Sequence, residues 1–250
     1  APALEAIIAE REIATAAIIV DEANATTAAQ AELFRATFEA AGVEVVDEVT
    51  YTTGDSSFAA QITQIASSEP DAIALAAGPA DAGRIAVEVD AQGLDTQLMG
   101  TGSLQSDING FLEAAGDAAE GTLSAAQYDP NSPDPVASEL LAAGSEALGV
   151  DEVPLNFAYG HDAVNIIASI IEAGELSGDS ATLAADRIAI QEGLNGLEDF
   201  VGMADRTEFG DDGFSIRPVL IAEIVDGEVV ISEVAADGGE DAAAETTEAA

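Results

Sequence analysis

The residues best placed to bind a ligand lie in two short turns, Ala77–Pro79 and Thr101–Ser103. Each turn closes a short apolar run, Ala72–Ala77 or Thr96–Gly102, and the amphipathic segment Ala80–Ala91 joins the two runs. Two strands joined by a helix of this length form a parallel pair with a right-handed crossover. Open parallel sheets bind ligands at the carboxyl ends of their strands. The sequence therefore predicts a binding site at these two turns.

Residue types that support catalysis or metal binding are scarce. His161 is the only histidine and there is no cysteine, which excludes a catalytic histidine pair, a cysteine nucleophile, a disulfide and most zinc sites. We expect His161 to pack or to face a hinge, with Asp162 beside it able to orient the imidazole. The glycines of Gly100–Gly102 lack the third glycine of a dinucleotide-binding turn. We therefore expect no enzyme, no metal and no cofactor.

Acidic pairs are a weaker signal for a hard cation. Pairs of this kind are Asp211 with Asp212, Asp129 with Asn131, and Glu240 with Asp241. Among 48 acidic residues such pairs arise by chance, and neither the spacing nor the bidentate glutamate of an EF-hand is present.

The charge balance limits the partners and the environment. The chain has 48 acidic and six basic residues, all arginine, for a net charge of −42. Nucleic acid is excluded as a partner, because phosphate binding requires clustered lysine or arginine. The same shortage of basic residues argues against binding to an anionic membrane surface. Such a charge destabilises a compact chain by self-repulsion unless salt screens it, and the Debye length is about 3 Å at 1 M salt. The absence of lysine together with this charge predicts a halophilic source.

The first half of the chain alternates between predicted strands and helices. Hydrophobic residues make up 48% of the sequence and occur in periodic blocks, unlike those of disordered acidic chains. Ser56 and Ser57 can cap the helix that runs to Ala66, whose Phe58, Ile62 and Ile65 share one face. The predicted order is strand Ala14–Val20, helix Thr27–Ala41 ending at Gly42, strand Val43–Tyr51, a helix ending at Ala66, the two strands and helix given above, helix Ile108–Ala115 and strand Gly121–Gln127. This alternation predicts an α/β fold, a doubly wound lobe with a parallel sheet.

The second half has a different character. The proline-rich loop Tyr128–Pro135 precedes predicted helices at Val136–Leu148, Phe157–Ala173 and Ser180–Gly193. Strands Leu220–Val225 and Val229–Val234 flank Asp226-Gly227, which predicts a hairpin with a type I′ turn. The acidic tail, residues 235–250, is expected to be disordered. In the long central helix, the residues at core spacing are Ala163, Ile166, Ile167, Ile170 and Ile171.

Nothing in the sequence predicts membrane insertion or a leader within this segment. No apolar run reaches the roughly 18–20 residues that a bilayer requires. The first residues lack the basic and continuous apolar regions of a signal peptide. If the protein is exported, we expect its targeting segment to lie upstream of Ala1.

Several segments, in order, resemble those of a known family. They are AAIIVDE at residues 16–22, the stretch from Ala40 to Gly102, GDAAEG at 116–121, the loop at 128–135, FAYGHDAVNII at 157–167, and the late segment at 197–219. Together they resemble the second half of a type I periplasmic solute-binding protein, the class of ABC-transporter receptors for branched-chain amino acids (leucine, isoleucine and valine), amides and related solutes. The resemblance covers roughly residues 1–233.

In that family, two lobes close on a ligand like a hinged clamp. The resemblance implies that residues 1–155 form the second lobe, that the helices of 156–217 cross to a truncated first lobe, and that strands in 218–234 return to the second lobe. Because most of the family's first lobe precedes this point, we expect the chain to be a fragment with one doubly wound lobe and an incomplete second lobe, the latter being the truncated first lobe of the family. The isoleucines of the long central helix would then face a sheet that this chain does not contain.

The resemblance also implies which residues contact the ligand. Contacts would come from the strand-end turns, and the candidate residues are Asn24, Ala77, Gly78, Thr101, Gly102, Ser103 and Tyr128. Amino-acid receptors of the family typically carry an acid where this chain has Gly102, and an aromatic near Ala25. Both departures argue against an α-amino acid as the ligand. A neutral polar or anionic solute could still bind to the backbone amides and hydroxyls of these turns. The alternative is that these are ordinary tight turns in which glycine supplies a positive φ.

The favoured function is capture of a small polar solute, such as a branched-chain amino acid or an amide, and its presentation to the membrane permease of an ABC transporter. Such a protein is extracytoplasmic, in the periplasm or tethered at the cell surface. The alternative is a ligand-sensing domain of the same fold in a receptor or regulator. An enzyme is the least favoured, because the strand-end turns hold Gly, Ala, Pro and Thr rather than an acid, base or nucleophile.

Overall fold

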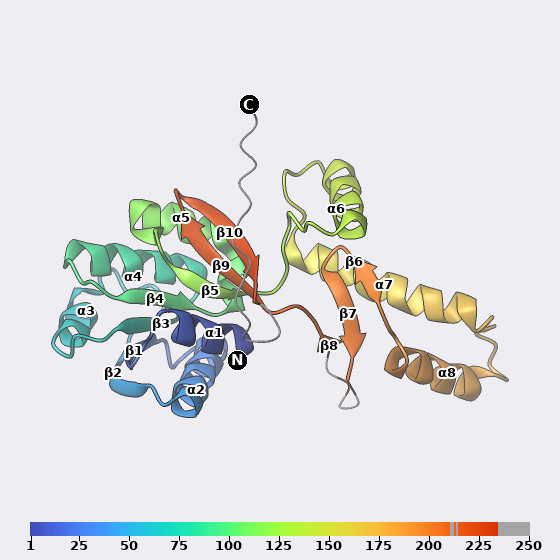
Figure 1. Ribbon diagram of the computed structural model, residues 1–250, viewed down its shortest axis with the longest axis horizontal. Coiled ribbons are helices and arrows are strands. Elements are labelled where there is room, and N and C mark those ends of the chain that lie inside the picture. The colour runs from blue at the N-terminus through green and yellow to red at the C-terminus, as the bar shows by residue number, and fades with distance from the viewer. Residues whose placement is uncertain (211–212, 214, 235–250) are drawn as a thin grey trace.

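The computed structural model describes residues 1–210, 213 and 215–234 (Figure 1). The acidic tail and the pairs Asp211 with Asp212 and Glu240 with Asp241 lie outside the described residues. The helices and strands of the described residues form two groups (Figure 1). The first is a large sheet with its helices, and the second is a smaller group of helices and short strands.

A seven-stranded sheet organises the first group. Its spatial order is β10-β9-β5-β4-β3-β1-β2. The pairs among β1 to β5 are parallel, whereas β9 pairs antiparallel with β5 and β10 antiparallel with β9. The strands are β1 (Thr15–Val20), β2 (Glu44–Thr50), β3 (Ala72–Ala76), β4 (Gln97–Gly100), β5 (Leu123–Ala126), β9 (Leu220–Val225) and β10 (Glu228–Glu233). The predicted α/β lobe with a doubly wound, mostly parallel sheet is confirmed.

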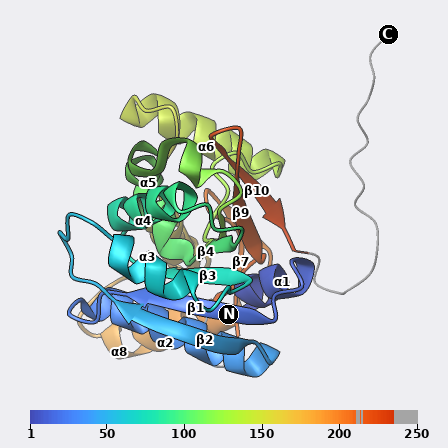
Figure 2. The same cartoon turned by 90° about the vertical axis from the view of Figure 1, so that its left-hand side faces the viewer.

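Two layers of helices cover the two faces of this sheet (Figure 2). The helices are α1 (Pro2–Glu10), α2 (Ala25–Ala41), α3 (Ala59–Ala66), α4 (Pro79–Ala91) and α5 (Ile108–Ala115), with 3-10 turns η1 (Gly102–Asp107) and η2 (Gly116–Ala119). Along β1, Ala17 and Ile19 pack with the layer of α3, α4 and α5, whereas Ile18 packs with the layer of α1 and α2. Alternate side chains of a strand point to opposite faces, so a strand covered on both faces must be apolar throughout.

The predicted boundaries of the first half agree with the structure to within a few residues, and two local details differ. Helix α3 begins at Ala59 with Phe58 as N-cap, and the Ser57 hydroxyl accepts from the Ala59 N–H at 3.3 Å. Helix α1 was not predicted, although Leu4 and Ile7 are fully buried beneath the sheet. Helix α2 ends at Gly42 with φ 75°, the left-handed stop that the glycine predicts.

The second group contains α6 (Pro135–Leu148), α7 (Leu155–Ala173) and α8 (Leu183–Asn195). It also holds a small antiparallel sheet that the sequence analysis did not predict: β6 (Phe200–Gly202), β7 (Asp205–Phe209) and β8 (Ser215–Ile216). Strands of two to five residues are too short to show an alternating pattern. The β9–β10 hairpin turns through Asp226 and Gly227 with φ 54° and 77°, and positive φ at both central residues is what the predicted type I′ turn requires.

Most of the α7 residues at core spacing are not buried among the described residues. Of the five residues at core spacing, only Ile166 is buried, whereas Ala163 and Ile171 are exposed and Ile167 and Ile170 are partly exposed. The physical reason is that α8 and β6 cover only part of α7 among the described residues. The predicted helix is therefore present, and most of its apolar face is uncovered among the described residues.

Candidate functional site

The turn after β4 is the most polar of the predicted turns. Thr101 caps η1, and its Oγ1 lies 2.7 Å from the Ser103 Oγ. From α2, the Gln30 Nε2 donates to the same Ser103 Oγ at 2.9 Å. Thr101 and Gln30 are both more than nine-tenths buried, and the Gln30 Oε1 has no hydrogen-bond partner among the described residues. Three neutral polar side chains thus meet at the carboxyl end of β4, and the Gln30 Oε1 remains available to accept a hydrogen bond.

Gly102 belongs to this turn because another side chain lies directly against it. A Cβ at Gly102 would stand 2.8 Å from the Gln127 Cγ. The Gln127 Nε2 donates to the Gly102 carbonyl at 2.8 Å, and the Gln127 N–H donates to the Gln105 Oε1 at 2.6 Å. Close approach, rather than a positive φ, accounts for the glycine, since neither Gly102 nor Gly78 has a positive φ. The interpretation of these turns as positive-φ glycine turns is therefore wrong.

The turn after β3 offers backbone rather than side chains. Ala77 is fully buried in the core. Gly78 is the N-cap of α4, with φ −68° and ψ 154°, and a Cβ there would meet open space. In the first turn of α4, Asp81 forms an ion pair with Arg84. Gly78 therefore leaves room for a ligand beside the N-terminus of α4.

At the end of β1, the polar side chains are held by local contacts. The Asn24 Oδ1 caps α2 by accepting from the Thr26 N–H at 2.9 Å. Asp21, 2% exposed, accepts from the Ala23 N–H at 3.0 Å and from the Thr53 N–H and hydroxyl at 3.0 and 2.5 Å. The hydroxyl bond from Thr53 is the main cause that lowers the pKa of Asp21, against the opposing effect of burial. Both residues thus have structural roles.

Tyr51 is a residue at this edge that the sequence analysis missed. The sheet order reverses between β1 and β3, which is the switch point at which open α/β sheets bind ligands. The Tyr51 hydroxyl is buried without a hydrogen-bond partner among the described residues. Burial raises its pKa, and the charges of Asp81 and Asp21 raise it further. An aromatic residue directly after a strand was the only sequence signal for it.

Tyr128 does not join the other candidates. Its ring is buried with Leu141, Val153 and Met203, and its hydroxyl donates to the Val153 carbonyl. Burial raises the pKa of Tyr128 to about 12, with contributions from the charges of Glu152 and Asp129. The structure therefore brings Thr101, Gly102 and Ser103 together with Gln30 and Gln127, and leaves the side chains of Asn24 and Tyr128 outside this cluster.

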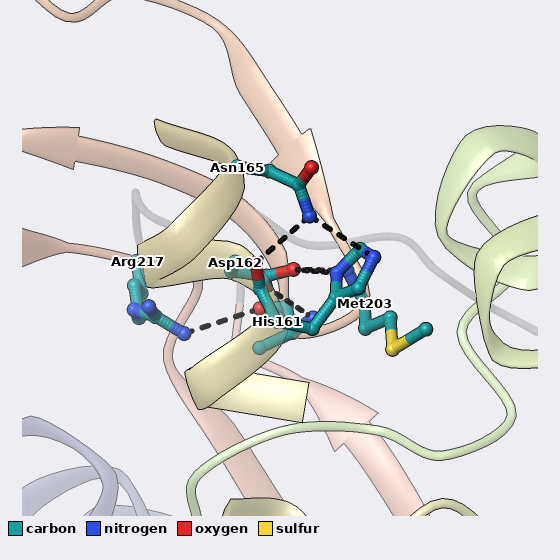
Figure 3. Close-up of polar contacts among 6 residues, drawn as sticks. His161, Asp162, Asn165, Met203 and Arg217 are labelled. Atoms are coloured by element: carbon teal, nitrogen blue, oxygen red, sulfur yellow. Dashed lines mark hydrogen bonds and ion pairs between the residues drawn. The ribbon is translucent and has the colours of Figure 1, made fainter. Parts of the chain in front are cut away.

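A second polar cluster joins α7 to the turn between β6 and β7 (Figure 3). The Asp162 carboxylate, 1% exposed, accepts from the N–H groups of Met203 and Ala204, both at 2.8 Å. The His161 Nδ1 lies 3.1 Å from the Asp162 Oδ1, and the His161 Nε2 lies 3.0 Å from the Asn165 Nδ2. His161 thus packs against Asp162, as predicted, and the cluster contains no serine or cysteine nucleophile.

Tyr159 connects this cluster to the carboxyl edge of the sheet. Its hydroxyl donates to the Gln127 carbonyl at 2.8 Å, and the Arg217 guanidinium lies 4.4 Å from its ring centre. The Arg217 Nη1 also donates to the Ala204 carbonyl at 3.3 Å. Three chain segments that link the two groups of elements are thus held to one another.

The described part of the chain holds neither a membrane-spanning helix nor a cluster of metal ligands. No helix there combines the length and apolar character needed to cross a bilayer. No group of three or more potential metal ligands was found in the same residues.

Solved structures of similar fold cover nearly all of this chain. A leucine-binding protein of Thermotoga maritima is 23% identical with a TM-score of 0.75. The branched-chain amino acid transporter substrate-binding protein of Streptococcus pneumoniae, in complex with isoleucine, is 20% identical with a TM-score of 0.71. A solute-binding protein of Rhodopseudomonas palustris, in complex with benzoate, is 18% identical with a TM-score of 0.72. Each alignment covers 92% of this chain but only 63, 63 and 61% of the respective structures.

No curated protein sequence matches this chain. A family model described as periplasmic binding protein matches residues 1–228. This chain therefore belongs to the periplasmic binding protein family, whose members are extracytoplasmic solute-binding proteins rather than enzymes.

Proposed function

We propose that this chain is part of the solute-binding component of an ABC transporter and captures a small polar solute at the carboxyl edge of its sheet. The observation that carries the proposal is the cluster of Gln30, Thr101 and Ser103, in which the Gln30 Oε1 lacks a partner. A buried acceptor without a partner costs about 1–3 kcal/mol, and a solute N–H or O–H that reached this cluster would relieve that cost.

The nearby charges favour recognition by hydrogen bonds rather than by ion pairing. The Asp21 carboxylate already accepts hydrogen bonds from Thr53 and Ala23, and Asp81 already forms an ion pair with Arg84. The turn after β4 has no carboxylate to hold an ammonium group. Among the solutes considered, an amide or a similar neutral molecule therefore suits this edge better than a branched-chain amino acid. The relatives solved with isoleucine and with benzoate illustrate that structures of similar fold hold different solute classes.

The proposed domain layout divides the chain after residues 155 and 217, and it assigns α6 to the lobe of the large sheet. Residues 1–155 would form the second lobe, 156–217 would cross to a first lobe, 218–234 would return, and 235–250 would form an acidic tail. The layout is supported by the exposed apolar face of α7 and α8, where Val164 is 68% and Ile188 57% exposed. The relatives' additional length, about a third of each structure, would supply the covering lobe.

The partner would be the membrane permease of the transporter, reached from the extracytoplasmic side. The charge of −42 supports a halophilic source, because self-repulsion of this size requires screening. We expect the thermal unfolding midpoint to rise steeply with KCl up to molar concentrations. A midpoint that does not depend on KCl would contradict the proposed halophilic source.

A thermal-shift screen in molar KCl tests the proposed function. The panel contains primary amides, branched-chain amino acids, and aliphatic and aromatic carboxylates. A solute present at 100 times its Kd stabilises the protein by about 2.7 kcal/mol, which is a clear rise in midpoint. Ser103→Ala should remove the shift caused by the best solute, whereas Ser68→Ala, far from this edge, should keep it. The absence of a shift with every class would count against solute binding.

A further inference from the structure

A groove lies beside β10. The predicted turns after β1, β3 and β4 do not line it. Its volume is about 240 Å³. Its walls are η1 with the start of α5, strand β10, and the segment from Glu152 to Asn156 that opens α7. In Figure 1, β10 and α5 belong to the group of the large sheet, and the segment that opens α7 leads into the second group. The groove therefore lies at the junction of the two groups.

Five of the residues that line the groove are apolar or aromatic and are buried or half-buried, and we call them its floor. They are Tyr128, Val153, Leu155, Val229 and Ile231. The bond from the Tyr128 hydroxyl to the Val153 carbonyl ties two of these residues together. An apolar body that entered the groove would be removed from water at roughly 25 cal/mol per Å² of buried apolar surface.

The rim of the groove is polar and carries one sign of charge. Asp107 and Glu152 line it together with Gln105, Asn109 and Asn156, and no arginine is among the lining residues. Neither acid forms an ion pair with any described residue. The charge of Glu152 is felt at the floor, since it contributes to the raised pKa of Tyr128. The potential in the groove thus favours a positive ligand group.

We propose that this groove binds a small amphipathic organic cation, with its apolar body on the Tyr128–Val153 floor and its ammonium group between Asp107 and Glu152. Carboxylates accept charge-assisted hydrogen bonds from ammonium groups, and a pocket with an apolar floor and few polar groups is the usual form of a small-molecule site. The site is separate from the solute cluster of Gln30, Thr101 and Ser103, so it does not depend on the proposed function. Because it touches the start of α7, an occupant would contact both groups of elements.

The test uses 2-phenylethylammonium as the probe and 2-phenylethanol as its neutral counterpart, in calorimetric titrations at the lowest KCl concentration that keeps the protein folded. The ammonium should bind at least about tenfold more tightly than the alcohol, which is the usual effect of a hydrogen bond to a charged group. The double variant Asp107→Asn/Glu152→Gln should abolish that preference. Asparagine is also a good N-cap, so the cap that Asp107 provides for α5 is preserved.

Three controls keep the test specific. Glu39→Gln/Glu146→Gln removes the same charge from exposed positions outside the groove and should preserve the preference. Val229→Trp should fill the groove and abolish binding of both probes. The variant should still fold, because β10 is an edge strand and large aromatic residues are favourable in strands. Ser103→Ala should leave probe binding unchanged. Failure of the ammonium to bind, equal affinity for both probes, or an undiminished preference in the groove variant would each overturn the proposal.

Discussion

The two groups of elements differ in what holds them together. In the large sheet, β1 and β3 are buried on both faces, and each adjacent helix contributes fully buried aliphatic or aromatic side chains. Helix α8 has no buried residue at all, and in α7 only Ala158, Asp162 and Ile166 are buried. The second group is held chiefly by polar contacts around Asp162 and by a small cluster around Tyr128 and Met203. The comparison indicates that the sheet group is stabilised by its own apolar core, whereas the second group depends more on specific hydrogen bonds.

The largest expected effect lies in the core of the sheet. Phe111→Ala in α5 should lower the free energy of unfolding by about 3–5 kcal/mol, because the ring is fully buried and its loss leaves a cavity. Urea unfolding in constant KCl measures this change. A loss below about 1 kcal/mol would contradict the view that this core carries the stability.

The second group should instead respond most to Asp162. Asp162→Ala leaves the N–H groups of Met203 and Ala204 without acceptors, at about 1–3 kcal/mol for each buried group. Asp162→Asn keeps one acceptor oxygen and should lose roughly half as much. Hydrogen exchange at the two amides is the measurement, and unchanged protection in Asp162→Ala would show that the carboxylate does not hold this turn.

Alanine substitution of one helical glycine in each group, Gly83 in α4 and Gly160 in α7, compares how tightly the two groups are packed. A Cβ at Gly83 in α4 would stand 2.7 Å from the Ala114 Cβ and from the Phe111 carbonyl oxygen, so Gly83→Ala should destabilise by about 1–3 kcal/mol. A Cβ at Gly160 in α7 would meet nothing within 4 Å. Gly160→Ala should therefore stabilise by about 0.5–1 kcal/mol through helix propensity. The thermal unfolding midpoints of both variants measure these changes. Midpoints that shift in the same direction would contradict the predicted difference in packing between the two groups.

Sequence patterns predicted the sheet group well because each of its elements has a strong local signal. The apolar run at residues 16–20 and the Asp226-Gly227 turn each predict one structure, and that structure is present. The small sheet of β6, β7 and β8 was missed because its strands are short and because the contact that holds its β6–β7 turn, from the Asp162 carboxylate, spans 41 and 42 residues. Long-range hydrogen bonds of this kind leave no periodic pattern.

The candidate site was predicted only in part, for a related reason. Position after a strand identified Thr101 and Ser103, because the carboxyl ends of parallel strands share one edge. Gln30 lies in the middle of a helix, and its contact with Ser103 spans 73 residues. Tyr128 follows a strand as predicted, but its ring turns toward Val153. Position along a strand thus indicates the edge of the sheet but not where a side chain points.

A smaller effect, confined to acid pH, is expected at the switch point. The folded-state pKa of Asp21 lies below its ordinary value of 3.8, so its contribution to stability is present above that value and is lost as the pH falls through the lower folded-state pKa. Thr53→Val removes the hydroxyl bond and should raise the pKa of Asp21, which a carboxyl NMR titration measures. The difference in stability between the wild type and Asp21→Asn should shrink as the pH falls below about 4. A difference that stays constant with pH would contradict this role.

The smallest expected effect is on the exposed face of α8. Ile188→Ala should change the free energy of unfolding of this chain by no more than about 0.5 kcal/mol, because the side chain is 57% exposed and alanine favours a helix. Leu141→Ala in α6, at a position 4% exposed, is the matched control and should cost about 2–5 kcal/mol. If α8 is covered by another lobe, as the proposed layout requires, the same Ile188 change should be costly in a protein that carries that lobe, since a buried isoleucine truncated to alanine loses about 2–5 kcal/mol. A large loss in the present chain would instead mean that a second copy already covers this face, and a concentration-dependent unfolding midpoint would identify that case.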